Sequence, residues 1–221
     1  RRFPSVGRLH APAIRLERAI SDLYGLAPEG TPDPRPWLLH RPEPYAFLGA
    51  EGEGLHQVAV GPVHAGIIEP GHFRFTASGE TVVRLEERLG YVHKGIEALL
   101  AGSDIGHAAK LMGRVSGDST VAYAFAFARA VEDAIDIEPP PRAIWLRALM
   151  AELERLANQL GDIGAICNDA AFAIMLAHCG VLRERVLRAS EAAFGHRLMR
   201  DCIVPGGVAI NLDQEGIRHI G

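Results

Sequence analysis

Residues 143–160 read AIWLRALMAELERLANQL, and this stretch decides the fold class. Leucine recurs in it at intervals of three and four residues, at Leu146, Leu149, Leu153, Leu156 and Leu160. This spacing places the leucine side chains on one face of an α-helix, and Pro141 suits the first turn of such a helix. We therefore expect a long amphipathic helix here, the strongest helical signal in the chain.

Further helices are expected on both sides of this one. An apolar stripe runs from Val92 to Leu100, and a second helix begins near Ser119, whose hydroxyl could cap it. A fourth helix runs roughly from Leu182 to Met199 and stops before the sequence Pro-Gly-Gly at 205–207. Four helices joined by short connections fit a bundle.

The pattern between residues 56 and 88 has a period of two instead. Residues 57–60 (QVAV) are short and β-like, and Phe73 and Phe75 flank Arg74. Ser78-Gly79 supplies a turn, after which residues 81–85 return as a strand. The expected fold class is α+β, with a small antiparallel β-sheet packed against a predominantly helical four-helix bundle.

The N-terminal part carries one short amphipathic helix, Ala13 to Tyr24, with Gly25 as its stop. Prolines between residues 28 and 36 then stiffen residues 27–44 into an extended connector. The expected domains are an N-terminal piece and linker (1–44), a β-hairpin or sheet region (45–88) and the helical bundle (89–221).

Composition excludes some classes of function. The net charge of −4 argues against a nucleic-acid binder. The longest apolar run, residues 170–182, is interrupted by His178 and Gly180 and is too short to span a bilayer. Three cysteines without CxxC spacing are typical of reduced, packed thiols in a cytoplasmic protein. Any membrane association must then come through partners.

Two stretches concentrate groups that could carry chemistry. Residues 61–72 (GPVHAGIIEPGH) hold His64, Glu69 and His72 in a glycine- and proline-rich loop. Residues 114–119 read RVSGDS. Composition alone favours a plain hairpin loop with solvent-facing histidines, and the close spacing of titratable groups in apolar sequence strengthens the alternative, a functional loop. On the predicted helix, by contrast, Glu152, Glu154 and Arg155 are expected to form a solvated face.

These stretches resemble, in order and with the right gaps, the large subunit of group 4 (formate-hydrogenlyase-type) nickel-iron hydrogenases and the 49 kDa subunit of complex I. The resemblance runs from about His56 to Val208 and includes residues 92–97 (VHKGIE) and 140–143 (PPRA). Residues 17–36 resemble the tail of the complex I 30 kDa subunit, so we expect a piece of a longer protein.

The resemblance implies roles for individual residues. His64 would reach a quinone headgroup, and Glu69 and His72 would relay protons. The pocket would also be lined by residues of the second stretch, Arg114, Ser116, Asp118 and Ser119. Arg142 is a further candidate for an ion pair or for facing a partner, and His93 and Glu97 could face one pocket if they lie one helical turn apart.

The departures from the family pattern limit what is carried over. The hydrogenases have cysteines where this chain has Ser116 and Ser119, and serine hydroxyls are hard and stay protonated near neutral pH. We therefore expect no metal in this chain, and an iron-sulfur cluster in the partner subunit. Gly117 stands where complex I has a quinone-binding tyrosine, which weakens the case for quinone.

The sequence thus favours a large, 49 kDa-like subunit of a membrane-associated NADH-quinone oxidoreductase or hydrogenase-type electron-transfer complex. Its partners would be a small iron-sulfur subunit and membrane subunits, and it would be peripheral to the inner membrane. A catalytically silent scaffold or coupling subunit is the alternative, and a true hydrogenase is the third.

Overall fold

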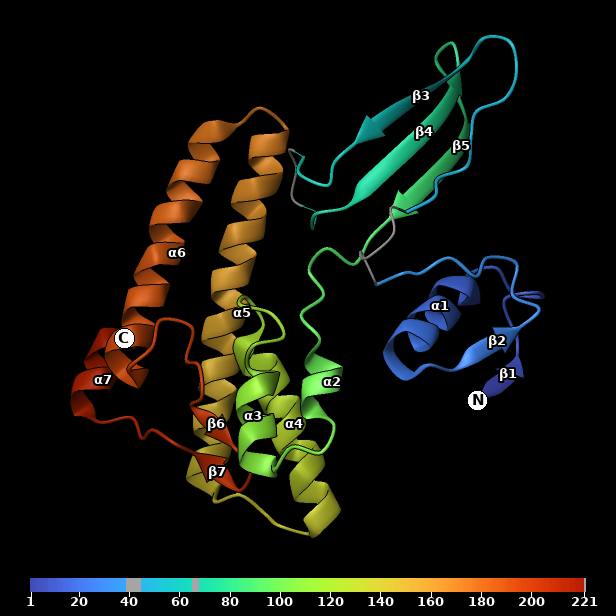
Figure 1. Cartoon of the computed structure of the whole chain (residues 1–221). Helices are drawn as coiled ribbons and strands as arrows, with labels where there is room; N and C mark the ends of the chain where they lie inside the picture. Colours follow the sequence, from blue (N-terminus) through green and yellow to red (C-terminus); the bar gives the residue numbers. More distant parts are fainter. Residues whose placement is uncertain (39–44, 65–67, 221) are drawn as a thin grey trace. The chain divides into compact units, whose positions relative to one another are not determined.

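The computed structural model describes residues 1–38, 45–64 and 68–220 (Figure 1). The chain forms two compact units, Arg1–Lys94 and Gly95–Gly221, which we call the N-terminal unit and the helical unit. Helices and small antiparallel sheets occur together, so the fold class is α+β. Residues 39–44 of the predicted connector and 65–67 of the predicted loop lie outside the described residues.

The first helix of the N-terminal unit, α1 (Ala13–Tyr24), has the predicted limits. It ends at Gly25, whose φ of 63° lies in the left-handed region that favours glycine. Two short strands, β1 (Arg2–Pro4) and β2 (Ala27–Glu29), pair in parallel beside it. This pairing was not predicted, because three-residue strands carry no readable alternation.

A three-stranded antiparallel sheet follows, in the order β3 (Leu55–Val60), β4 (His72–Ser78) and β5 (Thr81–Arg88). Ser78 pairs with Thr81, so Gly79 and Glu80 form a two-residue hairpin loop at the predicted turn. The β-like segment at 57–60 belongs to β3, which pairs with β4 as the third strand.

The two faces of this sheet differ in an unusual way. Val58 and Leu85 each pair with Phe75 of the middle strand, so all three lie on one face of the sheet, where Val58 and Leu85 are about half exposed. Side chains of the opposite parity, such as Glu86 and Arg88, are buried although they are charged. Their partners come from the proline-rich segment: Arg35 Nη1 donates to Glu86 Oε1 at 2.9 Å, and Arg88 Nη1 donates to the Pro36 carbonyl at 3.0 Å. This network fixes that segment to the sheet.

The helical unit contains α2 (Ile96–Leu100), α3 (Ile105–Met112), α4 (Thr120–Ile135), α5 (Pro141–Asp169), α6 (Ala173–Phe194) and α7 (Gln214–Ile220). A two-stranded hairpin, β6 (Ile203–Val204) and β7 (Gly207–Val208), lies between the last two helices. The leucine-rich helix starts at Pro141, as predicted. The separate helix α3 was missed, and α6 begins nine residues earlier than the predicted Leu182.

The core of this unit lies where α4, α5, α6 and the β6 segment meet. Its fully buried members include Val121, Met150, Phe194 and Cys202. The long helices α5 and α6 run side by side in opposite directions (Figure 1). Gly164 permits their close approach, because a Cβ at that position would lie only 3.1 Å from Cys179 Cβ. In the described parts of the chain, no helix is long and apolar enough to cross a membrane.

Candidate functional site

The stretch 114–119 forms the turn between α3 and α4, and Arg114 anchors its start. The guanidinium donates to both carboxylate oxygens of Asp201, from Nη1 at 2.6 Å and from Nη2 at 2.8 Å. Hydrogen bonding to Arg114 lowers the pKa of Asp201. The side chains are 38% and 39% exposed, so water screens the pair and its stabilising effect is modest.

Two hydroxyls at the turn, those of Ser116 and Thr120, are bound by groups of the turn itself. Ser116 Oγ donates to the Asp118 carboxylate, and Thr120 Oγ1 lies 3.2 Å from the carbonyls of both Ser116 and Gly117. Gly117 faces open space, since a Cβ there would meet nothing within 4 Å. Ser119 occupies the N-cap position of α4 but makes no side-chain capping bond, so the predicted cap is wrong.

The cap of α4 comes from α5. Glu154 accepts the backbone N–H of Val121 at 2.6 Å and that of Ala122 at 3.0 Å. The expectation that Glu154 lies on a solvated face is therefore also wrong. Its neighbour Glu152 is exposed and pairs with Arg155 at 2.7 Å, as a solvated face would.

Asn158, one helical turn after Glu154 on α5, binds the same turn. Its Nδ2 donates to the backbone carbonyl of Asp118. Burial raises the pKa of Glu154, and the nearby Asp118 carboxylate adds to that shift. A narrow cavity of about 10 Å³ lies beside these groups, with Arg183 and Arg197 also in its wall. Such a volume is close to that of one water molecule.

The loop at 61–72 belongs to the N-terminal unit, and its two ends nearly touch. Gly61 has a φ of 80°, and a Cβ there would lie 2.0 Å from the Gly71 carbonyl oxygen. His64 donates from Nε2 to the Glu69 carbonyl at 3.2 Å, and His72 donates from Nδ1 to the Gly61 carbonyl at 3.1 Å. The two predicted histidines thus brace the described ends of the loop.

The outer side chains of the loop differ in exposure. The Glu69 side chain is exposed. His72 Nε2 is buried and has no hydrogen-bond partner among the described residues, and Phe47 packs on the imidazole with ring centroids 4.9 Å apart.

Two further predicted residues are Arg142 and His93. Arg142 is exposed and braces the segment before α7, donating to Asn211 Oδ1 and to the Leu212 carbonyl, each at 2.8 Å. Helix α2 begins at Ile96, so His93 is not on it. The prediction that His93 and Glu97 are one helical turn apart is wrong.

The donor set at the turn does not suit a thiolate-bound metal. The Ser116 hydroxyl hydrogen is directed at Asp118, and among the described residues no group of three or more His, Cys, Asp or Glu side chains could hold a metal ion. The cysteines are elsewhere: Cys179 and Cys202 are buried between helices, and burial raises the pKa of the Cys202 thiol to about 11.

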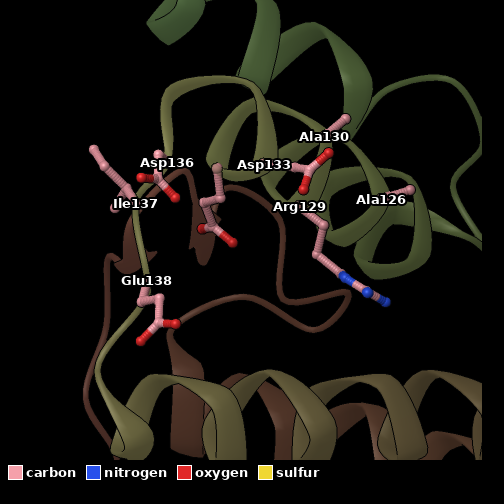
Figure 2. A pocket seen from close by; sticks show the side chains of 8 residues that line it. Ala126, Arg129, Ala130, Asp133, Asp136, Ile137 and Glu138 are labelled. Atoms are coloured by element: carbon pink, nitrogen blue, oxygen red, sulfur yellow. The ribbon is translucent and has the colours of Figure 1, made fainter.

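An acidic hollow, which the sequence did not predict, lies at the other end of α4. It has a volume of about 640 Å³ and carries Asp133, Asp136 and Glu138 together with Arg129. Figure 2 shows these side chains around the open space. Glu132, beneath them, is bound to Arg147 and to the Gly206 N–H. The hollow is an open acidic surface beside a structural ion pair.

Comparison with known proteins gives a partial family match and two groups of relatives. Residues 94–160 match the family described as nickel-dependent hydrogenase. The chain is 34% identical, over 97% of its length, to hydrogenase-4 component G of Escherichia coli, of which it covers 43%. It is 32% identical, over 95% of its length, to formate hydrogenlyase subunit 5 of the same organism, of which it covers 42%.

A second group of relatives comes from respiratory complexes. An NADH-quinone oxidoreductase subunit of Koribacter versatilis is 29% identical over 76% of this chain, which covers 42% of that protein. A solved structure of a membrane-bound sulfane sulfur reductase, an archaeal respiratory membrane complex, matches with a TM-score of 0.68 at 23% identity, covering 74% of this chain and 43% of that one. That likeness shows a shared fold.

Residues 94–160 thus match the nickel-dependent hydrogenase family, and the chain is homologous to group 4 hydrogenase large subunits and to complex I 49 kDa subunits. The chain spans about two fifths of the length of the two curated Escherichia coli relatives (43% and 42%).

Proposed function

We propose that this chain is part of the large subunit of a membrane-associated electron-transfer complex that works without a nickel-thiolate centre at the turn 114–119. The observation that carries this proposal is the chemistry of the turn. Ser116 and Ser119 offer hydroxyl groups in place of thiolates, and the Ser116 hydroxyl is already bound to Asp118. Hard, protonated oxygens are poor ligands for nickel and low-spin iron.

A quinone-like acceptor is the substrate class that the remaining groups suit. Reduction of a quinone to a quinol consumes two electrons and two protons, so the acceptor needs proton donors at its carbonyl oxygens. We assign His64 to donate a hydrogen bond to a carbonyl oxygen, and Glu69 and His72 to carry protons. What supports this assignment is that the Glu69 side chain is exposed to solvent and that His72 Nε2 is buried without a hydrogen-bond partner among the described residues.

The turn contributes polarity without a metal. Arg114, Ser116, Asp118 and Ser119 are assigned to the wall of the acceptor cavity. The electrons would come from an iron-sulfur cluster of a small partner subunit, and membrane subunits would hold the complex at the inner membrane.

The four-helix bundle expected from the sequence is also part of this proposal. Helices α5 and α6 already pack along their length, and α4 contacts α5 near the core. Many apolar side chains at the far end of the α5–α6 pair are exposed, among them Ile163, Ile166 and Phe172. Helices from elsewhere in a longer protein would cover such a surface.

The alternative is a catalytically silent scaffold or coupling subunit. The internal satisfaction of the Ser116, Asp118 and Thr120 groups favours it, because a turn that binds itself needs no ligand. Among the described residues, the buried His72 Nε2 has no hydrogen-bond partner, and this favours the redox function, because such a nitrogen does not stabilise a pure scaffold.

Metal analysis of the full-length protein, purified with its small subunit, tests the central claim. We expect iron, contributed by the partner, and no nickel. Stoichiometric nickel would overturn the proposal, since the serines would then not prevent metal binding.

Two variants separate the redox function from the scaffold. His64→Ala should slow electron transfer to a soluble quinone analogue while the complex still assembles, with His56→Ala, an exposed histidine on β3, as the matched control. Gly117→Tyr adds a ring in open space and should strengthen binding of the analogue. Equal rates in His64→Ala and His56→Ala would favour the scaffold.

A further inference from the structure

The start of α4 is held from outside the helix. The first N–H groups of any α-helix have no partner within it. Ser119, the N-cap residue, makes no capping bond, and the Thr120 hydroxyl points back to the turn. Glu154 of α5 takes up two of these N–H groups, those of Val121 and Ala122.

A second residue of α5 binds the chain just before the helix. Asn158 lies one helical turn from Glu154, so the two side chains project from the same face of α5. Their bonds are opposite in kind: the Glu154 carboxylate accepts from backbone N–H groups, and the Asn158 amide donates to the Asp118 carbonyl. Together they fix the backbone on both sides of residue 119, and with it the place of the turn.

The arrangement carries an electrostatic cost that a simple cap would avoid. The Glu154 carboxylate is partly buried and lies near the negative charge of Asp118. The positive end of the α4 dipole offsets only part of this cost. A serine at position 119 that capped the helix would satisfy one N–H with no buried charge. This electrostatic cost has a purpose only if the function depends on the exact position of the turn 114–119.

We propose that Glu154 and Asn158 are positioning residues for the acceptor, which they serve through the turn 114–119 without touching the acceptor themselves. This inference rests on the proposed function, in which the turn borders a quinone-like acceptor. It predicts that loosening either residue misplaces Ser116 and Asp118 and weakens acceptor binding, while the electron-transfer step in the bound state is kept.

The test uses the full-length protein in its complex, with Glu154→Ala and Asn158→Leu as the variants. Glu152→Ala, on the exposed side of the same helix, is the matched control, and Glu154→Gln keeps one acceptor oxygen as a conservative rescue. We expect KM for a soluble quinone analogue to rise about tenfold in the two variants with kcat unchanged, the size of a lost capping interaction. Glu154→Gln should be intermediate and the control unchanged.

A spin label at Gly117→Cys provides a readout that needs no activity, in a Cys167→Ser background because Cys167 is only partly buried. Position 117 faces open space, so the label reports the motion of the turn. The label should become clearly more mobile with Glu154→Ala and not with Glu152→Ala.

The outcomes separate the two proposals. A mobile label with an unchanged KM would show that Glu154 is only a helix cap and would overturn the inference, as would an immobile label. If the unmodified complex reduces no quinone analogue, the proposed function fails. In that case a positioning role requires that the spin label becomes more mobile in both Glu154→Ala and Asn158→Leu, and that its mobility is partly reduced again in Glu154→Gln. Any other pattern overturns the positioning role.

Discussion

Glutamates bind both ends of α4, and their carboxylates are paired with different kinds of group. Near the C-terminal end, Glu132 forms a two-pronged ion pair with Arg147 of α5, at 3.0 and 2.5 Å, and both side chains are almost fully buried. At the N-terminal end, Glu154 accepts two backbone N–H groups, from Val121 and Ala122, which carry no net charge.

The consequence appears in the pKa values. Hydrogen bonding to Arg147 lowers the pKa of Glu132, whereas burial raises the pKa of Glu154. Glu132 is therefore a fixed anion in a closed structural pair, which also binds the Gly206 N–H. Glu154, which binds the N-terminal end of α4 beside the turn 114–119, is the glutamate that can still change charge. The C-terminal end of α4 is thus held by a fixed ion pair, and its N-terminal end by a carboxylate whose charge can change with pH.

The sharpest way to break this comparison is to remove the cation at the rigid end. Arg147→Met leaves Glu132 buried without its partner, and such losses cost about 3–5 kcal/mol. The Val204 and Gly207 carbonyls would lose their donor as well. Urea unfolding of the 221-residue chain measures the change. The double variant Glu132→Gln, Arg147→Met should recover part of the loss, and a single-variant loss below about 1 kcal/mol would refute the assignment.

The pH dependence of stability distinguishes the two glutamates by sign. The pKa of Glu132 is lowered, so its contribution is present above its ordinary value of 4.5 and is lost as pH falls through the lower folded value. The pKa of Glu154 is raised, so its contribution is present below 4.5 and is lost as pH rises through the higher folded value.

The variant Glu154→Gln removes only the second effect. Its free energy of unfolding, relative to that of the unmodified chain, should therefore increase as pH rises above 4.5, by about 1 kcal/mol for each unit by which the folded pKa is raised. Chemical unfolding at a series of pH values between 4 and about 8 gives the curve. A difference that stays flat with pH, or that falls, would show that Glu154 is not a buried titrating group. Glu152→Gln is the exposed control.

The ion pair that holds the start of the turn should matter less. Asp201→Asn leaves Arg114 without its carboxylate, but both groups are more than a third exposed, so we expect a loss of about 0.5–1 kcal/mol. The loss should shrink in about 1 M salt, where the Debye length is near 3 Å. Urea unfolding at low and high salt checks it. Equal losses at both salt concentrations would point to a geometric role for Asp201 instead.

How far the sequence predicts this structure depends on whether a feature is local. The limits of α1 and the start of α5 follow from local signals, a left-handed glycine at position 25 and a proline in the first turn at 141. The hairpin at Ser78-Gly79 is local as well. The pairing of β1 with β2 joins residues far apart in sequence, and no pattern in either short strand predicts it.

The candidate site shows the same division. The loop 61–72 and the turn 114–119 were identified from residue types and from resemblance, but Glu154 was assigned to solvent. The leucine spacing predicts the helix α5 and part of its buried face, Leu146 and Leu153, but not which helix end packs beside that face. One signal was available: position 122, where a capping box would place Glu or Gln after Ser119, is alanine. When the local cap of a helix is incomplete, its first N–H groups need acceptors from another part of the chain.

The smallest expected effect is at Ser119 itself, and it tests the comparison most directly. If Glu154 supplies the cap, Ser119→Ala removes a hydroxyl that bonds to no N–H of α4, and the loss should stay within about 0.5 kcal/mol. A conventional N-cap serine would cost about 1 kcal/mol or more on the same change. Urea unfolding of Ser119→Ala, Glu154→Ala and the double variant decides between them. Losses that add would show independent roles, whereas a larger effect of Ser119→Ala in the Glu154→Ala background would show that serine takes over the cap once the carboxylate is gone.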